Sequence, residues 1–370
     1  MDSFTGKLAV VTGGGSGMGR ELVSQLATAG CSVAACDLNP DTVAEAAVST
    51  QAEAGSGVLV TGHACDVADE AQLLRFRDEL LEAHARDHVN LVFANAGVGG
   101  GGSFVDGDRA EWERTFAIDW QGVYYTARVF LPLLVASGEG ILVNTSSVNG
   151  LWATLGPGMP NTAYSAAKFA VRGFTEALIE DLRVHAPHVR VALVLPGHVG
   201  TGIMANTRRV HGQPGPEDVG PAELAEARAV LGGSGLVPEG ASDEELRQLL
   251  TRLDNDFKDK APVTAAQAAT IILDGVRSGT WRILIGQDAA WLDRLVRARP
   301  EVAYDYEEFF NEAAVAEYTS AAQGAAAQGA AAQGAAAQAA AAQGAPAQAA
   351  AAQAAAAQAA AAQAAAAQAM

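Results

Sequence analysis

The sequence predicts an α/β fold, a doubly wound parallel sheet with helices on both faces. Short apolar, β-branched segments alternate with longer amphipathic ones, which is typical of strands that alternate with helices. The short segments are apolar at consecutive positions rather than at every second one, which indicates strands buried on both faces of a parallel sheet. Right-handed crossovers between such strands place helices on both sides of the sheet.

Each element follows from these patterns in chain order. Apolar runs predict strands at 7–12, 32–37, 58–65, 90–94, 140–145, 190–195 and 282–285. The amphipathic segments predict helices at 20–30, 41–54, 68–84, 108–135, 161–186 and 264–278. Gly30 suits the end of the first helix, and Asp41 and Thr42 suit the start of the second. The long helix at 108–135 tolerates Pro132 because the proline lies near its end.

These elements fall within residues 1–300, which contain no linker and which we interpret as one domain. Residues 198–262 lack a strand pattern, and an excursion of this length is usually functional or mobile, with a plain surface insertion as the alternative. Residues 301–320 are interpreted as a C-terminal extension. Residues 321–370 repeat a five-residue unit of Ala and Gln, which indicates a low-complexity tail without a catalytic role.

Charge and composition argue against several classes of protein. The 24 basic residues stand against 42 acidic ones, so nucleic acid is not expected as the main partner. Uncharged apolar runs are too short to span a membrane, and the N-terminus lacks the apolar run of a signal peptide. Cys31, Cys36 and Cys65 follow no metal or redox spacing, so we expect no metal site and a reducing, cytoplasmic location.

A glycine-rich loop after the first strand predicts a phosphate-binding site. The string TGGGSGMG at 12–19 lets backbone N–H groups approach a ligand, and the helix that follows adds partial positive charge. Its spacing, G-x-x-x-G-x-G, differs from the common dinucleotide pattern, and a flexible turn would give the same string. The position between strand and helix favours the pyrophosphate of a dinucleotide in a Rossmann-type fold. The residues expected to bind it are Gly13, Ser16, Gly17, Met18 and Gly19.

Polar residues that follow the next strands extend this site, because ligands bind at the carboxyl edge of an open parallel sheet. Asp37 ends the second strand, where its carboxylate can accept hydrogen bonds from both adenosine ribose hydroxyls and would repel a 2′-phosphate. The expected cofactor is therefore NAD rather than NADP, and the alternative for Asp37 is a helix-capping or turn role. The segments after strands three and four add Asp66 and Val67, near the adenine, and Asn95, Ala96 and Gly97.

Tyr164 and Lys168 lie four residues apart and therefore on one face of a predicted helix. A neighbouring ammonium and a positively charged nicotinamide ring favour the phenolate and lower the pKa of the tyrosine. Such a tyrosine can remove the proton of an alcohol while hydride leaves its carbon. Ser147, just after the fifth strand, could hold the substrate oxygen. A Tyr-x-x-x-Lys pair alone is common on ordinary helices, and only the upstream motifs make it specific.

Taken together, these motifs resemble those of the short-chain dehydrogenase/reductase family, in its smaller single-domain branch. They occur in family order: T-G-x-x-x-G-x-G at 12–19, Asn-Ala-Gly at 95–97, Ser147, Tyr164-x-x-x-Lys168 and P-G-x-V-x-T at 196–201. The resemblance implies that Tyr164 is the general acid/base, that Lys168 binds the nicotinamide ribose and helps to lower the tyrosine pKa, and that Ser147 orients the substrate.

The resemblance also implies further contacts and partners. On the nicotinamide side the cofactor would touch Pro196, Gly197, Val199 and Thr201. Residues 202–262 correspond to the variable substrate lid of the family. Dimers or tetramers are implied through the two long helices at 108–135 and 161–186.

Two positions depart from the family pattern. This chain has Asp119 where the family usually has Asn in the helix after strand four. We expect the proton relay of the family to survive through the backbone carbonyl, so that Asp119→Asn leaves the rate within a few-fold. The alternative is a relay that depends on the side chain, in which case turnover should suffer. Ser147 also precedes Tyr164 by more residues than is common in the family. The extra residues, within 151–160, predict a loop that bulges over the substrate pocket, and Ser146 is the weaker alternative for the serine role.

The sequence therefore predicts an NAD-dependent alcohol dehydrogenase or carbonyl reductase that acts on a small-molecule secondary alcohol or ketone. A largely apolar pocket is suggested by Trp152, Leu155, Met159, Ile203 and Met204. The alternative is a non-catalytic dinucleotide-binding sensor or scaffold with the same fold, although a sensor has no need of Ser147, Tyr164 and Lys168 together. Epimerase or dehydratase chemistry on nucleotide sugars fits poorly, because the proteins of similar fold that carry out this chemistry have a different spacing of glycines in the loop.

Overall fold

The computed structural model of the chain describes residues 1–156, 159–232, 237, 240–311, 314, 316 and 318. The predicted tail at 321–370 lies outside these residues, as do parts of the predicted lid and of the C-terminal extension. The chain divides into two compact units, Met1–Asp293 and Arg294–Met370. The sheet and the candidate site both lie in the first unit.

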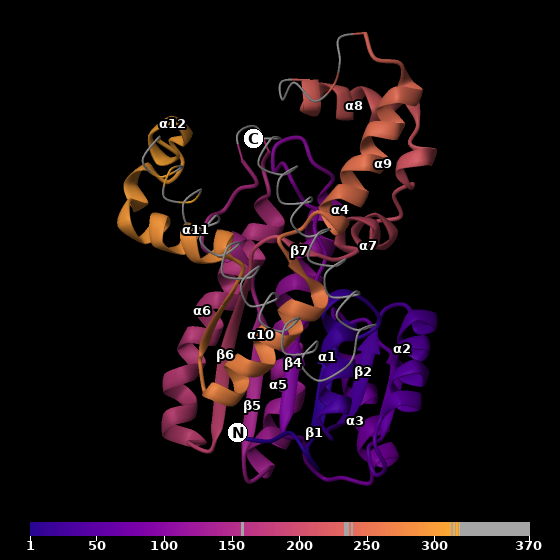
Figure 1. Cartoon of the computed structure of the whole chain (residues 1–370), viewed down its shortest axis with the longest axis vertical. Helices are drawn as coiled ribbons and strands as arrows, with labels where there is room; N and C mark the ends of the chain where they lie inside the picture. Colours follow the sequence, from indigo (N-terminus) through magenta and orange to yellow (C-terminus); the bar gives the residue numbers. More distant parts are fainter. Residues whose placement is uncertain are drawn as a thin grey trace, which may run out of the picture. The chain divides into compact units, whose positions relative to one another are not determined.

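Seven of the described strands form one sheet, in which every neighbouring pair is parallel. They are β1 (Leu8–Thr12), β2 (Ser32–Asp37), β3 (Val60–Ala64), β4 (Leu91–Ala94), β5 (Gly140–Thr145), β6 (Val189–Pro196) and β9 (Arg282–Ile285). Their order is β3-β2-β1-β4-β5-β6-β9 (Figure 1). The order reverses between β1 and β4, so the predicted doubly wound fold is confirmed, with its switch point beside the glycine loop.

Helices connect these strands and cover both faces of the sheet. They are α1 (Gly17–Thr28), α2 (Pro40–Glu53), α3 (Glu70–His84), α4 (Arg109–Phe116), α5 (Gly122–Ala136), α6 (Thr162–His185) and α10 (Ala265–Ser278). The first helix begins earlier than predicted, at Gly17, so its N-terminus lies inside the glycine loop. The second is capped by Asn39, which accepts the N–H groups of Asp41 and Thr42 at 3.0 and 3.3 Å. Asp41 and Thr42 lie in its first turn as predicted, while Pro40 occupies the first helical position and Asn39 provides the cap.

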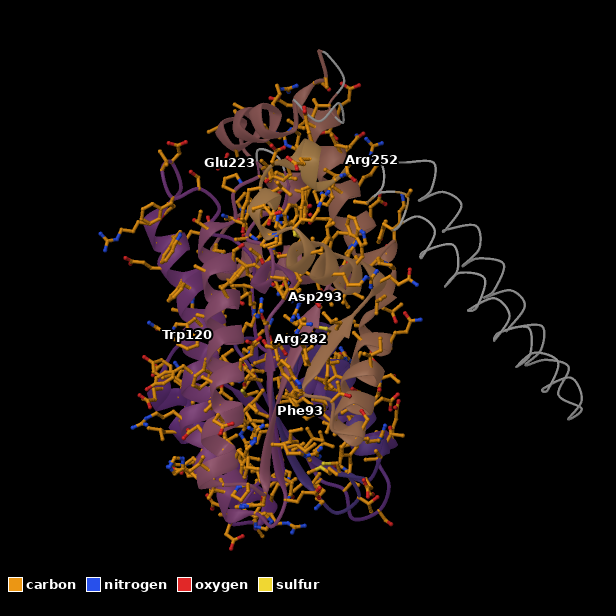
Figure 2. All side chains as sticks on the ribbon, turned by 90° about the vertical axis from the view of Figure 1, so that its left-hand side faces the viewer. Phe93, Trp120, Glu223, Arg252, Arg282 and Asp293 are labelled. Carbon is orange, nitrogen blue, oxygen red and sulfur yellow. The ribbon has the colours of Figure 1, made fainter. Side chains whose placement is uncertain are left out.

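Five strands of the sheet, β1, β2, β4, β5 and β6, contribute side chains to two apolar cores. Ala9 and Val11 of β1 pack in the core under α1, α2 and α10. Leu8 and Val10 of the same strand pack in the core under α3, α5 and α6. Phe93 of β4 is fully buried in the sheet (Figure 2). Burial on both faces explains why the strands are apolar at consecutive positions and not at alternate ones.

The predicted helix at 108–135 is not continuous. The structure has α4, then a π-helical segment η1 (Ala117–Gln121), then α5. Such a widened turn often marks a functional site, and it leaves the apolar periodicity of the flanking turns unchanged. The sequence therefore contained no signal for it, and the prediction of one regular helix was wrong.

Short elements occupy residues 198–262. They are β7 (Val199–Gly200), α7 (Ile203–Val210), η3 (Pro216–Asp218), α8 (Pro221–Gly232) and α9 (Asp243–Asp259). The strand β7 pairs with β8 (Val263–Thr264), so the prediction of a segment without strands was wrong at two residues, which are too few to form a pattern. Among the described residues, no helix is long and apolar enough to cross a membrane.

The chain after the sheet forms α11 (Gln287–Ala298), η4 (Pro300–Val302) and α12 (Tyr306–Phe309). Within the first unit, Arg282 of β9 binds Asp293 of α11 through two hydrogen bonds of 2.7 and 2.5 Å (Figure 2). Within the second unit, Arg299 donates to the carbonyl groups of Glu308 and Phe309 at 2.5 and 2.6 Å. These contacts hold each unit together locally.

Candidate active site

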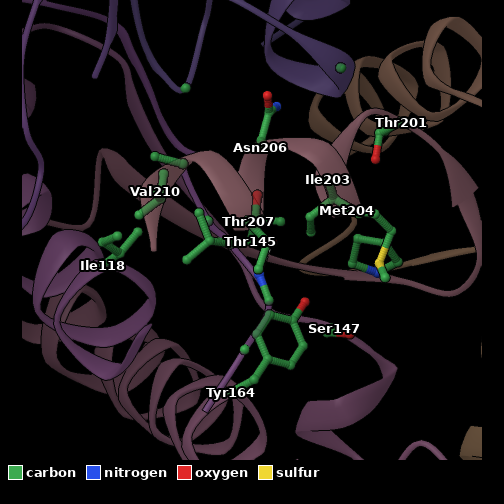
Figure 3. Close-up of a pocket in the computed structure, with 18 of the residues that line it drawn as sticks. Ile118, Thr145, Ser147, Tyr164, Thr201, Ile203, Met204, Asn206, Thr207 and Val210 are labelled. Carbon is green, nitrogen blue, oxygen red and sulfur yellow. Dashed lines mark hydrogen bonds between the residues drawn. The ribbon is translucent and has the colours of Figure 1, made fainter. Parts of the chain in front are cut away.

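A cavity of about 1150 Å³ opens at the carboxyl ends of the strands, where the residues predicted to bind the cofactor come together. Helix α7 lies along its mouth, with Ile203, Asn206 and Thr207 facing it (Figure 3). The predicted residues that line it are Gly13, Ser16, Gly17, Met18, Asp37, Asp66, Val67, Asn95, Ala96, Gly97, Ser147, Tyr164, Lys168, Pro196, Gly197, Val199 and Thr201. Gly19 and Asp119 do not line it, so any role they have is indirect.

The glycine loop packs so closely against neighbouring backbone and side chains that Gly13, Gly15 and Gly19 leave no room for a Cβ atom. Gly13 has a φ of 67°, and a Cβ there would lie 2.8 Å from the Cα of Ala96. A Cβ at Gly15 would lie 2.5 Å from the Thr42 hydroxyl. One at Gly19 would lie 2.0 Å from the Gly13 carbonyl oxygen, so Gly19 lets α1 pack against the loop. The result is a cradle of backbone at a helix N-terminus, which fits a pyrophosphate.

Asp37 presents a fixed carboxylate beside this cradle. One oxygen accepts the N–H of Gly15 and the other accepts the N–H of Asn39, both at 3.0 Å. The two backbone donors hold the charge at the end of β2 and along the cavity wall. This geometry fits the predicted ribose contact. It also fits the turn alternative, because the bond from Asn39 joins residues two positions apart, whereas the helix-capping alternative fails because Asn39 caps α2.

The Asn-Ala-Gly motif joins β4 to β1. Thr12 accepts the N–H groups of Asn95 and Ala96 at 3.0 and 3.1 Å through its hydroxyl, and the Asn95 amide donates to the Thr12 carbonyl at 3.1 Å. Gly97 has a different role. A Cβ there would lie 2.7 Å from a carboxylate oxygen of Asp119 and 3.2 Å from Nζ of Lys168. The motif therefore fixes the strand end and leaves room for a buried charged pair.

Tyr164, Lys168 and Ser147 converge in the cavity. Tyr164 and Lys168 come from one face of α6, with Nζ of Lys168 5.3 Å from the centre of the Tyr164 ring. The Tyr164 hydroxyl points into the cavity, on the side where Ser147 lies (Figure 3). Lys168 donates to the Thr145 carbonyl at 3.2 Å. Ser146 instead donates its hydroxyl to the Lys168 carbonyl at 2.7 Å, so the geometry favours Ser147 over Ser146 as the serine of the site.

Opposing electrostatic effects of the protein act on the pKa of Tyr164. Burial raises the pKa of its phenol above the ordinary value, and the Asp119 carboxylate adds to this effect. The Lys168 ammonium and a hydrogen bond from Ser147 lower that pKa but do not outweigh burial. Lys168 thus lowers the pKa of Tyr164, as predicted. The prediction took into account neither the burial of the ring nor the charge of Asp119.

Comparison with known proteins identifies the family. The family model described as short chain dehydrogenase matches residues 7–211. A protein named as an oxidoreductase, SadH of Mycobacterium tuberculosis, is 33% identical over 297 residues, which cover 80% of this chain and 92% of the relative. The chain belongs to the short-chain dehydrogenase family. It is an oxidoreductase with a nicotinamide-dinucleotide-binding fold.

Two further relatives are informative. The 2-dehydro-3-deoxy-L-rhamnonate dehydrogenase (NAD(+)) of Sphingomonas is 34% identical over 181 residues, 48% of this chain and 67% of that protein. The crystal structure of a short-chain dehydrogenase/reductase from Burkholderia phymatum in complex with NAD has a TM-score of 0.65 and 29% identity. It covers 82% of this chain and 96% of that one. The family therefore extends over the sheet and the site described above.

Within this family framework, the loop after β5 lies where it was predicted. Trp152 and Leu155 of this loop line the cavity together with Ile203 and Met204. Met159 is not among the residues that line it, so the expectation for this residue was wrong. The predicted turn residues Pro157 and Gly158 lie outside the described residues. The described part of the loop thus forms one apolar wall of the cavity.

Several cavity residues had no signal in the sequence. Arg114 of α4 forms an ion pair of 2.7 Å with Asp66, at the expected adenine end. On α7, Asn206 donates to the Ser16 hydroxyl at 3.0 Å and Thr207 accepts the N–H of Gly99 at 2.8 Å. These contacts join separate parts of the chain, and no spacing rule predicts such pairs. They show that helix α7 is in contact with both the glycine loop and the segment after β4.

Proposed function

We propose that this chain is an NAD-dependent dehydrogenase or reductase that acts on a secondary alcohol or ketone of a largely apolar small molecule. The observation that carries the proposal is the convergence of Tyr164, Ser147 and Lys168 in the cavity that begins at the glycine loop. A cavity of about 1150 Å³ is large enough for a dinucleotide and a substrate together.

The cofactor assignment rests on Asp37 and the glycine loop. The loop backbone would hold the pyrophosphate, and Asp37 would hold the adenosine ribose with a carboxylate that disfavours a 2′-phosphate. Asp66 and Val67 would lie at the adenine, and residues 196–201 at the nicotinamide. When bound, the nicotinamide supplies or accepts the hydride. The NAD named for the Sphingomonas and Burkholderia relatives supports this choice.

The chemistry of the chain itself is a proton transfer at Tyr164. In reduction, the phenol would donate its proton to the carbonyl oxygen of the substrate, and in oxidation the phenolate would remove the proton of the alcohol. Ser147 would hold the same oxygen by a hydrogen bond, which strengthens as negative charge develops on it. Trp152, Leu155 and Met204 provide an apolar wall that would exclude water from the reacting oxygen.

Tyr164→Phe tests the mechanism. We measure NADH formation with a panel of secondary alcohols, using NAD and NADP in parallel, and NADH binding by fluorescence. The variant should lose turnover and keep NADH binding, because only the acid/base hydroxyl is removed. Tyr304→Phe is the matched control, since Tyr304 is 57% exposed and is not among the residues that line the cavity. Retained turnover in Tyr164→Phe would refute the role of the phenol.

We also propose a homodimer or homotetramer that associates through α5 and α6. Both helices expose apolar side chains, with Tyr124, Val135 and Phe169 each about two-fifths exposed. Trp120 and Phe174 pack edge to face beside them, which provides a rigid aromatic surface. Light scattering after gel filtration should give a multiple of the chain mass, and Phe169→Asp should lower it. A wild-type monomer at micromolar concentration would contradict this proposal.

A further inference from the structure

Asp119 and Lys168 form an ion pair that is shielded from solvent. Oδ1 of Asp119 lies 2.8 Å from Nζ of Lys168, and the side chains are 0% and 3% exposed. The other carboxylate oxygen accepts the N–H of Val98 at 3.4 Å, and Lys168 also donates to the Thr145 carbonyl. Asp119 lies in the π-helical segment η1, and Gly97 leaves the space in which the two charges meet.

The pair alters the field that acts on the Tyr164 phenol. The charged groups that act on this phenol are Lys168 from its own helix and Asp119 from η1, and they have opposite signs. The groups that act on Asp119 are Lys168 and, after the lid helix α7, His211. An isolated ammonium next to the phenol would favour the phenolate. An ammonium with a carboxylate 2.8 Å away presents a dipole, whose effect at the phenol is much weaker.

We propose that Asp119 is the fixed counter-ion of Lys168 and that, by neutralising this ammonium, it holds the proton on the Tyr164 phenol. Asp119 is thus a positioning residue that acts through Lys168, and it has no contact with the cavity. The kinetic consequence rests on the proposed function of Tyr164, whereas the protonation of Tyr164 can be measured without turnover. The backbone-relay expectation for Asp119 predicts no such effect of the side-chain charge.

Asp119→Asn is the direct test, and its readout is the ionisation of Tyr164. Tyrosinate absorbance is followed after stopped-flow pH jumps, and the Tyr164→Phe variant is subtracted so that only Tyr164 remains. The Tyr164 transition should move to lower pH by about one unit or more, as expected when a nearby like charge is removed. Glu139→Gln is the matched control, because it removes a carboxylate from an ion pair with Lys7 at the opposite end of the strands.

The outcomes separate the alternatives. One outcome is that the Tyr164 absorbance transition of Asp119→Asn has the same midpoint pH as those of wild type and Glu139→Gln, while the melting temperature is lower. This result would make Asp119 a structural residue only and overturn the proposal. A shift to higher pH would overturn it as well. If Asp119→Asn does not fold, Lys168→Met is compared with Lys168→Met/Asp119→Asn. Lys168→Met should move the Tyr164 transition to higher pH, and the added Asp119→Asn substitution should move it back to lower pH. The same transition pH in the single and the double variant would refute the counter-ion role.

The pH profile of turnover links the inference to the proposed function. The acidic limb of alcohol oxidation in Asp119→Asn should move to lower pH by the same amount as the absorbance transition. If Tyr164→Phe keeps its activity, the proposed function fails while the ionisation experiment still decides the role of Asp119. If Tyr164→Phe is inactive and neither transition moves in Asp119→Asn, only the inference about Asp119 fails.

Discussion

Replacing Gly97 by alanine should displace the buried Asp119–Lys168 ion pair and destabilise the protein. The added Cβ would lie 2.7 Å from Oδ1 of Asp119 and 3.2 Å from Nζ of Lys168, so the ion pair must move aside. Stretching that pair from 2.8 Å to roughly 3.4 Å costs about 1 kcal/mol at an effective dielectric constant of ~20. Overpacking in a close-packed interior adds about 1–3 kcal/mol. We therefore expect Gly97→Ala to destabilise the protein by roughly 2–4 kcal/mol.

Thermal unfolding followed by circular dichroism measures this loss. At roughly 1.5 °C per kcal/mol for a folded region of about 300 residues, the melting temperature should fall by about 3 °C or more. Gly173→Ala is the matched control, because a Cβ at Gly173, inside α6, meets nothing within 4 Å. Its higher helix propensity should leave the melting temperature unchanged or raise it. Equal melting temperatures for the two variants would refute the claim that Gly97 is required by the buried ion pair.

Three further predictions concern the cofactor loop, cofactor choice and pH. Gly19→Ala should weaken NADH binding, measured by fluorescence, because its Cβ would lie 2.0 Å from the Gly13 carbonyl oxygen; Gly138→Ala, with open space around it, should not. Asp37→Ser should reduce the preference for NAD over NADP roughly tenfold or more, because one charged hydrogen bond is lost. Competition binding assays measure this preference, and an unchanged affinity ratio would contradict the ribose role. Burial, then the charges of His63 and Arg86, lowers the pKa of His84 to about 4, so the unfolded chain binds more protons between pH 4 and 6.5. Stability should fall as pH drops through this range, and His84→Gln should show a shallower fall in urea titrations.

Much of the fold could be predicted because its signals are local. The bounds of β2, β5 and β9 agree with the predicted ranges, since each is a buried apolar run that ends at turn residues. Parallel pairing follows from apolar residues on both faces, and it brings the ends of β1 to β6 to one edge. The helix at 108–135 shows the limit of this reasoning. A π-helical turn changes the backbone but keeps apolar residues at helical spacing, so a periodicity argument does not detect it.

The residues of the candidate site could likewise be predicted only in part. The string at 12–19, Asp37 and the Tyr164–Lys168 pair were predicted to lie together, and the structure brings them around one cavity, because each sits directly at a strand end or on one helix face. The partners of these residues were not predicted. Arg114 meets Asp66 from another helix, and Asp288 accepts the N–H of His198 at 2.6 Å from beyond the last strand. Such contacts depend on how distant segments pack, and residue spacing carries no information about them.

The sequence alone therefore determined the order of strands and helices, the edge of the sheet that binds a ligand and the residue types present there. These properties depend on neighbouring residues and on general rules of chain topology. Only the tertiary structure decided the charge balance at Tyr164, because that balance depends on burial and on an ion pair between two separate helices. Asp119 and Lys168 meet only when η1 packs on α6, and the free energy of each charge depends on the solvent that this packing excludes.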